Sequence, residues 1–296
     1  MRRREFIAGL GAAAASALPF AARAQQPAMP VVGFLNATSP DAYRLRAFHQ
    51  GLKEAGFVEG ENVSIEYRWA DNQNDRLQTL AAELVRRQVT LIAAGGGFRS
   101  GLAAKTETKS IPVLFIAGED PVKLGLVTSL AKPDGNLTGV NILAAEVVAK
   151  RLELLRELLP KANHIDVLVD PASASTESTL TGLKAAAPTM GMQTQVFNAS
   201  TIREVDEAFV ALANGRPDAL FAGVSPFLLD RRVQLAQLAA RHAIPAIYQD
   251  REHAEVGGLM SYGASIGDAY RQLGVCRSCP QGRQTRGPAS SAVDQA

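Results

Sequence analysis

The strongest constraint on the fold of this chain is a regular alternation between short apolar runs and longer segments with helical spacing. In the first half the expected strands are residues 31–36, 63–69, 90–94, 111–116 and 137–142. The segments between them carry apolar residues three or four positions apart, at residues 41–56, 76–88, 98–109 and 121–131. Strands that alternate with helices of this length predict βαβ units around a parallel sheet.

The same alternation then starts again. An amphipathic segment at residues 145–159 precedes expected strands at residues 165–169, 193–197, 218–224 and 245–248, with helices at residues 177–190, 202–214 and 228–242. The stretches RRQVTLIAAGG and GRPDALFAGVS occupy like places in the two halves, each with a helix end, a buried strand and a loop of small residues. We therefore predict an α/β fold of two Rossmann-like lobes with parallel sheets, with a boundary near residues 141–145.

A short leader typical of an exported protein precedes the first expected strand. Arg2, Arg3 and Arg4 form a basic region, residues 7–22 are apolar and small, and residues 22–24 form an A-x-A cleavage site. Residues 3–7 also fit the twin-arginine export pattern, with ordinary secretion as the alternative. The apolar run is too short for a membrane span. We expect cleavage of residues 1–24 near Ala24 and a mature chain in the periplasm.

Without this leader the chain is nearly neutral and poor in cysteine. Removal of four arginines and one glutamate from 31 basic and 29 acidic residues leaves 27 against 28. Such a balance argues against a nucleic acid or an anionic membrane surface as partner. The only cysteines, Cys276 and Cys279, form a C-x-x-C pair without the partners of a zinc or redox site. We expect no cofactor and no bound metal.

Small and polar residues gather in the loops after the expected strands. The carboxyl ends of parallel strands meet at one edge of a sheet, where helix N-termini favour carboxylates and phosphates. The first lobe contributes Asn36, Thr38, Ser39, Gly95, Gly96, Gly97, Glu119 and Asp120. The second lobe contributes Asp170, Ser173, Ser175, Gly223, Ser225, Tyr248, Asp250 and Tyr262. We expect these residues to bind a small ligand between the lobes, although helix capping by Ser39 and Asp120 and packing by the two tyrosines are alternatives.

None of these loops carries a recognisable reaction centre. The glycine-rich loop at residues 95–101 has Ser100 where a dinucleotide fingerprint needs glycine, and it follows the third strand instead of the first. The loop at Ser225 lacks the flanking glycine of a nucleophile elbow. The four histidines have no metal-ligand spacing. We therefore predict a binding protein that is not an enzyme, with a nucleotide-dependent α/β enzyme as the less favoured alternative.

One long motif resembles a known family. Residues 119–141, EDPVKLGLVTSLAKPDGNLTGVN, are similar to the signature D-P-V-x-x-G-L-V-x-S-L-x-x-P-G-G-N-x-T-G of ABC transporter substrate-binding proteins of the tryptophan/tyrosine transport type. Residues 54–85, 150–160 and 259–274 resemble other segments of that family. The resemblance implies a hinged, two-lobed periplasmic binding protein fold of type I. Residues 25–142 and 261–275 would form the first lobe, and residues 143–260 the second.

The resemblance also implies a function. The ligand would be a small solute of the amino acid class, with aromatic amino acids included, which the protein delivers to an ABC permease in the inner membrane. The chain would be a monomer that does not itself insert into the membrane after leader cleavage. A periplasmic sensor subunit of the same fold is the alternative.

The resemblance ends near Val275. Relatives continue with more helix, a proline-containing linker, a strand and a last helix, whereas residues 276–296 are polar, basic and without period. We interpret this segment as a disordered tail that results from a changed reading frame or an equivalent truncation. A lobe without those elements would expose apolar surface and unpaired backbone.

Overall fold

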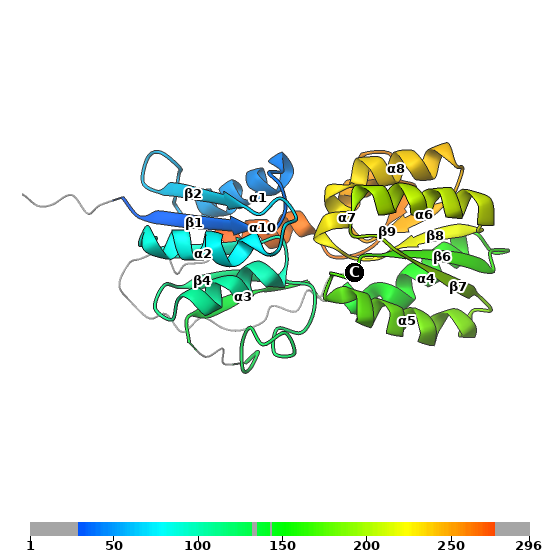
Figure 1. The fold of residues 1–296 in the computed structure, drawn as a ribbon, viewed down its shortest axis with the longest axis horizontal. Helices are drawn as coiled ribbons and strands as arrows, with labels where there is room; N and C mark the ends of the chain where they lie inside the picture. Colours follow the sequence, from blue (N-terminus) through cyan, green and yellow to red (C-terminus); the bar gives the residue numbers. More distant parts are fainter. Residues whose placement is uncertain (1–28, 132–134, 143, 276–296) are drawn as a thin grey trace, which may run out of the picture.

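The computed structural model describes residues 29–131, 135–142 and 144–275. The predicted leader and the predicted tail, with both cysteines, lie outside these residues. The described chain forms two five-stranded parallel sheets with helices on both faces of each (Figure 1). The predicted α/β fold with two lobes is therefore confirmed, whereas the predicted limits of the lobes stay a prediction.

Lobe 1 is built on a sheet with the strand order β2-β1-β3-β4-β5. Its strands are β1 (Val31–Asn36), β2 (Ser64–Trp69), β3 (Leu91–Gly95), β4 (Val113–Ala117) and β5 (Leu137–Asn141). Its helices are α1 (Ala42–Glu54), α2 (Arg76–Arg86), α3 (Phe98–Glu107) and, from the end of the described chain, α10 (Ile266–Val275). Helices α2 and α3 cover one face of the sheet, and α1 and α10 cover the other.

Lobe 2 repeats the arrangement with the strand order β10-β9-β8-β6-β7. Its strands are β6 (His164–Val169), β7 (Gln193–Asn198), β8 (Ala219–Ala222), β9 (Ala246–Tyr248) and β10 (Met260–Ser261). Its helices are η1 (Ala144–Val147), α4 (Val148–Leu158), α5 (Ser175–Thr189), α6 (Ile202–Gly215), α7 (Pro226–Asp230), α8 (Arg232–Arg241) and α9 (Arg251–Glu255). Helices α4 and α5 cover one face, and α6, α7 and α8 the other.

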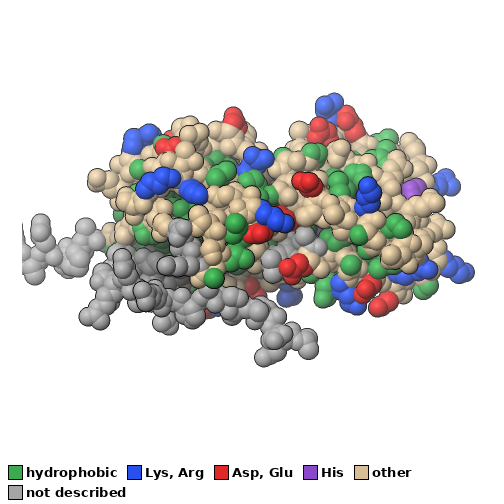
Figure 2. Space-filling model, turned by 90° about the horizontal axis from the view of Figure 1, so that it is seen from below, with side chains coloured by type: hydrophobic (Ala, Val, Ile, Leu, Met, Phe, Trp, Pro, Cys, Tyr) green, Lys and Arg blue, Asp and Glu red, His purple; other side chains and the backbone are tan. Residues whose placement is uncertain are grey.

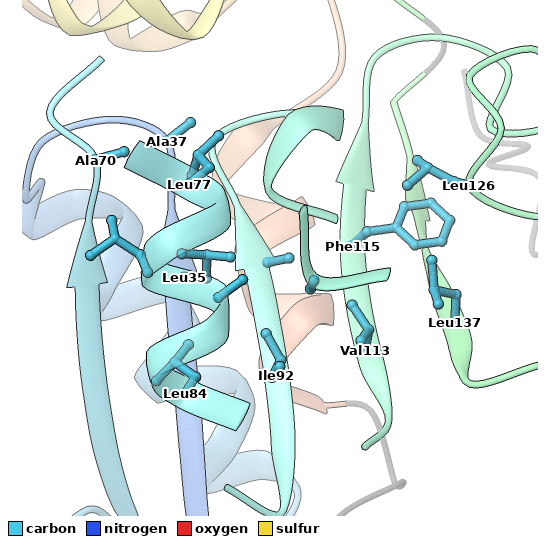
Figure 3. Packing of buried hydrophobic residues seen from close by; sticks show 14 of the residues in the cluster. Leu35, Ala37, Ala70, Leu77, Leu84, Ile92, Val113, Phe115, Leu126 and Leu137 are labelled. Atoms are coloured by element: carbon cyan, nitrogen blue, oxygen red, sulfur yellow. The ribbon is translucent and has the colours of Figure 1, made fainter. Parts of the chain in front are cut away.

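The central strands are mostly apolar because both of their faces are buried. Figure 3 shows one face of lobe 1, where Leu35 and Ile92 lie beside α2 with its Leu77 and Leu84, and Val113 lies near Phe115 and Leu137. The residues that alternate with them, such as Phe34 and Leu114, pack toward α1 and α10 instead. A parallel sheet covered on both sides requires this continuous apolar pattern, which is the signal that identified the strands in the sequence.

Helix α10 is an integral part of lobe 1, although it follows the whole of lobe 2 in the sequence. It packs along α1 at a very close approach of the two backbones (Figure 1). A Cβ atom on Gly51 would lie 1.9 Å from the carbonyl oxygen of Arg271, and one on Gly274 would lie 2.3 Å from that of Phe48. Only glycine fits at these two positions, so the helix crossing depends on them.

Two predicted helices differ from the observed structure. Residues 121–131 form turns and not a helix, because Gly125 adopts a left-handed φ of 70° that ends the first turn. Asp120 accordingly caps a turn, with its Oδ1 accepting a hydrogen bond from the backbone N–H of Val122 at 2.9 Å. The single helix predicted for residues 228–242 is divided into α7 and α8 at Arg231. No helix in the described ranges has the length and apolar character needed to cross a membrane.

Candidate functional site

A cavity of about 190 Å³ lies between the lobes, where the carboxyl ends of both sheets face each other. Loops after β1, β3 and β4 of lobe 1 and after β6, β8 and β9 of lobe 2, with the first turns of the helices that follow them, supply much of its lining. Ile142, Ile266 and Tyr270, which lie where the chain crosses between the lobes or in α10, also contribute. The cavity therefore occupies the place that parallel α/β sheets offer to ligands.

The wall of lobe 1 is held by a buried network of neutral hydrogen bonds. Asn36 Oδ1 accepts hydrogen bonds from the backbone N–H and the hydroxyl of Thr38, at 3.0 and 2.9 Å. Asn36 Nδ2 donates to the hydroxyl of Tyr270 at 2.8 Å, and so does the backbone N–H of Gly96 at the same distance. Asn36 and Thr38 are fully buried and do not line the cavity, so they support the residues that do.

The glycine-rich loop brings the backbone of lobe 1 close to both the network and lobe 2. Gly96 and Gly97 have φ values of 73° and 103°, which favour glycine. A Cβ on Gly96 would lie 2.3 Å from Asn36 Oδ1, and one on Gly97 would lie 3.2 Å from Pro226 of lobe 2. Gly96 and Gly97 thus allow a close approach of the backbone to Asn36 and to Pro226.

The wall of lobe 2 is organised by one carboxylate. Asp170 Oδ1 accepts hydrogen bonds from the backbone N–H of Ala172 at 3.0 Å and from the Ser200 hydroxyl at 2.6 Å. Asp170 Oδ2 accepts a hydrogen bond from the Ser225 hydroxyl at 2.7 Å. All four residues line the cavity. Asp170 therefore orients the loops that follow β6, β7 and β8, and its acceptor capacity is used within the lobe.

Two helix N-termini open onto the cavity, one from each lobe. Helix α3 begins after Gly97 without a capping side chain, whereas α5 begins after Ala174 and its first backbone N–H, that of Ser175, donates a hydrogen bond to the Ser173 hydroxyl at 3.3 Å. Arg99, in the first turn of α3, also lines the cavity and donates to the backbone oxygen of Ala172 at 3.3 Å. The uncapped start of α3, the dipoles of both helices and a guanidinium make this part of the cavity suited to an anionic group.

Asp250 supplies a carboxylate of a different kind. It is 5% exposed, lines the cavity, and its side chain makes no hydrogen bond with any other residue in the described part of the chain. Burial is the main cause that raises the pKa of its carboxyl to about 7. Glu252 adds to this shift in pKa, and Arg151 and Arg44 oppose it. A buried carboxylate without a partner is costly unless a ligand supplies a donor or a positive charge.

Arg151 of α4 fixes the position of the loops that follow β8 and β9. Its side chain is fully buried, and Nη2 donates to the backbone oxygens of Ala222 at 2.6 Å and Ile247 at 3.0 Å. Its guanidinium carbon lies 3.9 Å from the centre of the Phe221 ring. No sequence pattern indicated this role, because an arginine in an amphipathic helix normally lies on the solvent face.

The structure places the sequence-predicted residues in two groups. Those that line the cavity are Gly96, Gly97, Asp170, Ser173, Ser175, Ser225 and Asp250. Those that do not are Asn36, Thr38, Ser39, Gly95, Glu119, Asp120, Gly223, Tyr248 and Tyr262. Tyr248 is fully buried in the core of lobe 2 and Tyr262 is 42% exposed. Binding by any of these residues stays a prediction.

Several lining residues were not predicted from the sequence. They are Arg44, Asn72, Phe98, Arg99, Ser200, Phe227, Leu229, Ile266 and Tyr270. Phe98 and Arg99 directly follow the glycine loop, so their position after a strand end was a usable signal. Tyr270 and Arg44 lie inside helices, where nothing in the sequence separates a cavity residue from a core or surface residue. No cluster of three or more potential metal ligands occurs in the described ranges.

Two α/β lobes with a ligand-sized cavity between their carboxyl edges define a bilobal solute-binding fold. The chain belongs to the family of ABC transporter substrate binding proteins, which it matches over residues 28–277. It is 29% identical to the tyrosine-binding protein of Clostridioides difficile (strain R20291) over 229 residues. That match covers 77% of this chain but 64% of the relative, less than two thirds of its length.

Two solved structures illustrate the arrangement of the lobes. The ABC domain of a Streptococcus pneumoniae protein in complex with L-Trp is 21% identical, with 83% of this chain and 82% of that one covered and a TM-score of 0.72. The ligand-free, open form of a Clostridium difficile substrate binding protein is 26% identical, with 82% and 83% covered and a TM-score of 0.56. The present chain thus matches the fold of both.

Proposed function

We propose that this chain is the extracytoplasmic solute-binding component of an ABC uptake transporter, which binds a small solute between its lobes and delivers it to a membrane permease. Family membership supports the class. The observation that carries the proposal is that one cavity between the lobes is lined both by a helix start with Arg99 and by a buried carboxylate, Asp250, whose side chain bonds to no other residue of the described chain. Such a pair of opposite subsites suits a zwitterion.

The proposed solute is an amino acid with an aromatic side chain. Its carboxylate would bind near the N-termini of α3 and α5 and Arg99, and its ammonium group would pair with Asp250. Much of the remaining lining is apolar and includes Phe98, Ile116, Ile142, Phe227, Leu229 and Ile266. This lining favours burial of a large apolar group. The name of the tyrosine-binding relative supports the same class.

The proposed mechanism is binding without chemical change. The lobes would close about the crossing segments, remove the solute from water and strengthen its ion pair with Asp250, because charges interact more strongly in a less polar medium. The hydroxyls of Ser200 and Ser225 donate to Asp170 and that of Ser173 donates to a backbone oxygen, and no histidine lines the cavity in the described part of the chain. This arrangement supports a positioning role for the hydroxyls. The expected leader and the family support a periplasmic location.

The test is a thermal-shift screen of the mature protein against the natural amino acids, followed by titration calorimetry with each hit. A solute present at about 100 times its Kd should raise the free energy of unfolding by about 2.7 kcal/mol. Asp250→Asn should lower affinity for an aromatic amino acid at least about tenfold while raising stability at neutral pH, because it removes an unpaired buried charge.

Asp166→Asn is the matched control. Asp166 is also a buried carboxylate of lobe 2 whose pKa is raised by burial, but it does not line the cavity. Its substitution should leave affinity unchanged. The proposal fails if no amino acid stabilises the protein, or if Asp250→Asn binds the solute as tightly as the native chain does.

A further inference from the structure

We infer that ion pairs between the first turn of α1 in lobe 1 and the junction of α7 and α8 in lobe 2 form a clasp that sets solute affinity from outside the cavity. The clasp consists of Asp41 and Arg44 on one side and Asp230 and Arg232 on the other. Its effect on affinity rests on the proposed function. Figure 2 shows charged side chains of both signs along the boundary between the lobes.

Asp230 is the centre of the clasp. Its Oδ1 accepts a hydrogen bond from Arg44 Nη2 at 2.8 Å, and the two side chains are 7% and 4% exposed. Its Oδ2 accepts from Asn72 Nδ2 at 3.1 Å and from the backbone N–H of Ser39 at 3.4 Å. Among the described residues, all side-chain hydrogen bonds of Asp230 thus go to lobe 1. The Asp230 carboxylate makes no such hydrogen bond within lobe 2 among the described residues, so its hydrogen bonds form only when the two lobes are in contact.

The second ion pair has the opposite polarity. Arg232 of lobe 2 donates from Nη2 to Asp41 Oδ2 of lobe 1 at 2.6 Å, while its Nη1 donates to the Leu229 backbone oxygen at 3.2 Å. Each lobe therefore presents one cation and one anion in adjacent turns. A shifted arrangement would bring like charges together, so the crossed pairs favour one closed geometry over its neighbours.

The clasp is continuous with the wall of the cavity. Arg44 donates from Nη1 to the Thr38 hydroxyl at 2.6 Å, and Thr38 belongs to the network that holds Tyr270. Arg44 itself lines the cavity, whereas Asp41, Asp230 and Arg232 do not. The latter three residues thus act on affinity through Arg44 or through the relative position of the lobes, which makes them positioning residues.

Burial removes these charged groups from water, which costs free energy. The attraction within the ion pairs exceeds this cost only if the remaining donors and acceptors of the charged groups also form hydrogen bonds. Here Asp230 has three donors and Arg44 has acceptors at both terminal nitrogens. The closed form is therefore favoured relative to the separated lobes. Because apparent affinity falls with the fraction of binding-competent protein, loss of the clasp weakens binding of any solute that needs closure.

The test is a double-mutant cycle on the pair that lies outside the cavity, with Asp41→Asn, Arg232→Gln and the double variant in the full mature chain. Asparagine can still cap α1, as Asp41 does by accepting a hydrogen bond from the Arg44 N–H at 3.0 Å. Each single substitution should raise the Kd of the solute found in the screen by about tenfold, mainly through faster dissociation. The double variant should be little worse than either single one.

Glu207→Gln is the matched control, because Glu207 forms an exposed ion pair with Arg203 within α6. Its Kd should stay that of the native chain. Fluorescence energy transfer between dyes on the two lobes gives a second readout in solute-free protein, where the clasp variants should show a smaller closed fraction. The inference is overturned if both single variants keep the Kd of the native chain. It is also overturned if the double variant raises the Kd by the product of the two single effects, or if the closed fraction does not change. If no solute binds, the proposed function fails. The clasp is then tested by the closed fraction of the solute-free protein alone.

Discussion

The two lobes share one fold but build their halves of the cavity differently. In lobe 1, neutral hydrogen bonds join Asn36 to Tyr270, which lies 234 positions further along the chain. In lobe 2, the carboxylate of Asp170 binds hydroxyls supplied by loops of the same lobe. The cavity wall of lobe 1 therefore depends on the last helix of the described chain, whereas that of lobe 2 is complete within one continuous segment.

The lobes also differ in buried charge. In lobe 1 the only charged side chain among the buried polar residues of the described chain is Arg44, which pairs with Asp230 across the cleft. Lobe 2 buries several ionisable side chains, namely Arg151, Asp166, Asp170, Asp250, Glu252 and His253. Buried ionisable groups shift their pKa values and make stability depend on pH. Lobe 2 should therefore respond to pH, and lobe 1 to changes in packing at α10.

The largest effect should come from the contact of α10 with α1. Gly51→Ala places a Cβ against backbone and not against a flexible side chain, so the helices must separate. We expect a loss of about 3 kcal/mol in the free energy of unfolding, at the upper end for overpacking. Urea denaturation of the mature chain measures it, with hydrogen exchange to assign the loss to lobe 1.

Gly215→Ala makes the same change at the end of α6 in lobe 2. There an added Cβ has no atom within 4 Å. Since alanine is favoured over glycine in helices by about 1 kcal/mol, this variant should be as stable as the native chain or slightly more so. Equal behaviour of the two variants would show that α10 is not required for lobe 1.

The next prediction concerns Asp170, the carboxylate that organises the cavity wall of lobe 2. Asp170→Asn turns one acceptor into a donor, which then faces a hydroxyl or the backbone N–H of Ala172. Hydrogen bonds to a charged group contribute about 1.5–3 kcal/mol, so we expect a loss of about 2.5 kcal/mol, confined to lobe 2 in hydrogen exchange. Asp206→Asn is the control, because Asp206 accepts only an exposed hydrogen bond from Gln234. Equal losses in both variants would remove the special role of Asp170.

A somewhat smaller effect is expected at Tyr270, which joins the neutral hydrogen-bond network of lobe 1. Tyr270→Phe removes the hydroxyl that accepts hydrogen bonds from Asn36 and Gly96, and leaves one buried and one part-buried donor unpaired. We expect a loss of about 2 kcal/mol together with weaker solute binding. Tyr262→Phe changes a tyrosine that is 42% exposed and lies outside the cavity, so it should leave both quantities unchanged. If Tyr270→Phe lost hydrogen-exchange protection in lobe 2 instead of lobe 1, the proposed difference between the two lobes would be contradicted.

The sequence predicted what local pattern determines. Strands buried on both faces are continuous apolar runs, and the loops after them carry small and polar residues, so the two sheets and the cavity-facing loops such as Asp170–Ser175 could be found. The helix expected at residues 121–131 was wrong, because the apolar spacing did not reveal the conformation of Gly125. Arg44, Arg151 and Tyr270 lie in helices, where their contacts depend on segments far away in the sequence. Periodicity carries no signal of such contacts.

The smallest effect should distinguish the lobes by pH. The pKa of Asp250 is raised to about 7, above its usual value of 3.8, so the folded state retains a proton that the unfolded state has lost. The stability that this proton contributes is complete below about pH 4 and is lost as the pH rises through about 7. From pH 6 to pH 7 the native chain should therefore lose about 1 kcal/mol relative to Asp250→Asn. Burial lowers the pKa of His253 to about 4, so this group makes stability rise with pH. Because both proteins contain His253, its effect cancels in the difference between them. The measurement is the difference between urea unfolding curves of the two proteins at each pH, and parallel pH profiles would mean that Asp250 is not protonated in the folded state.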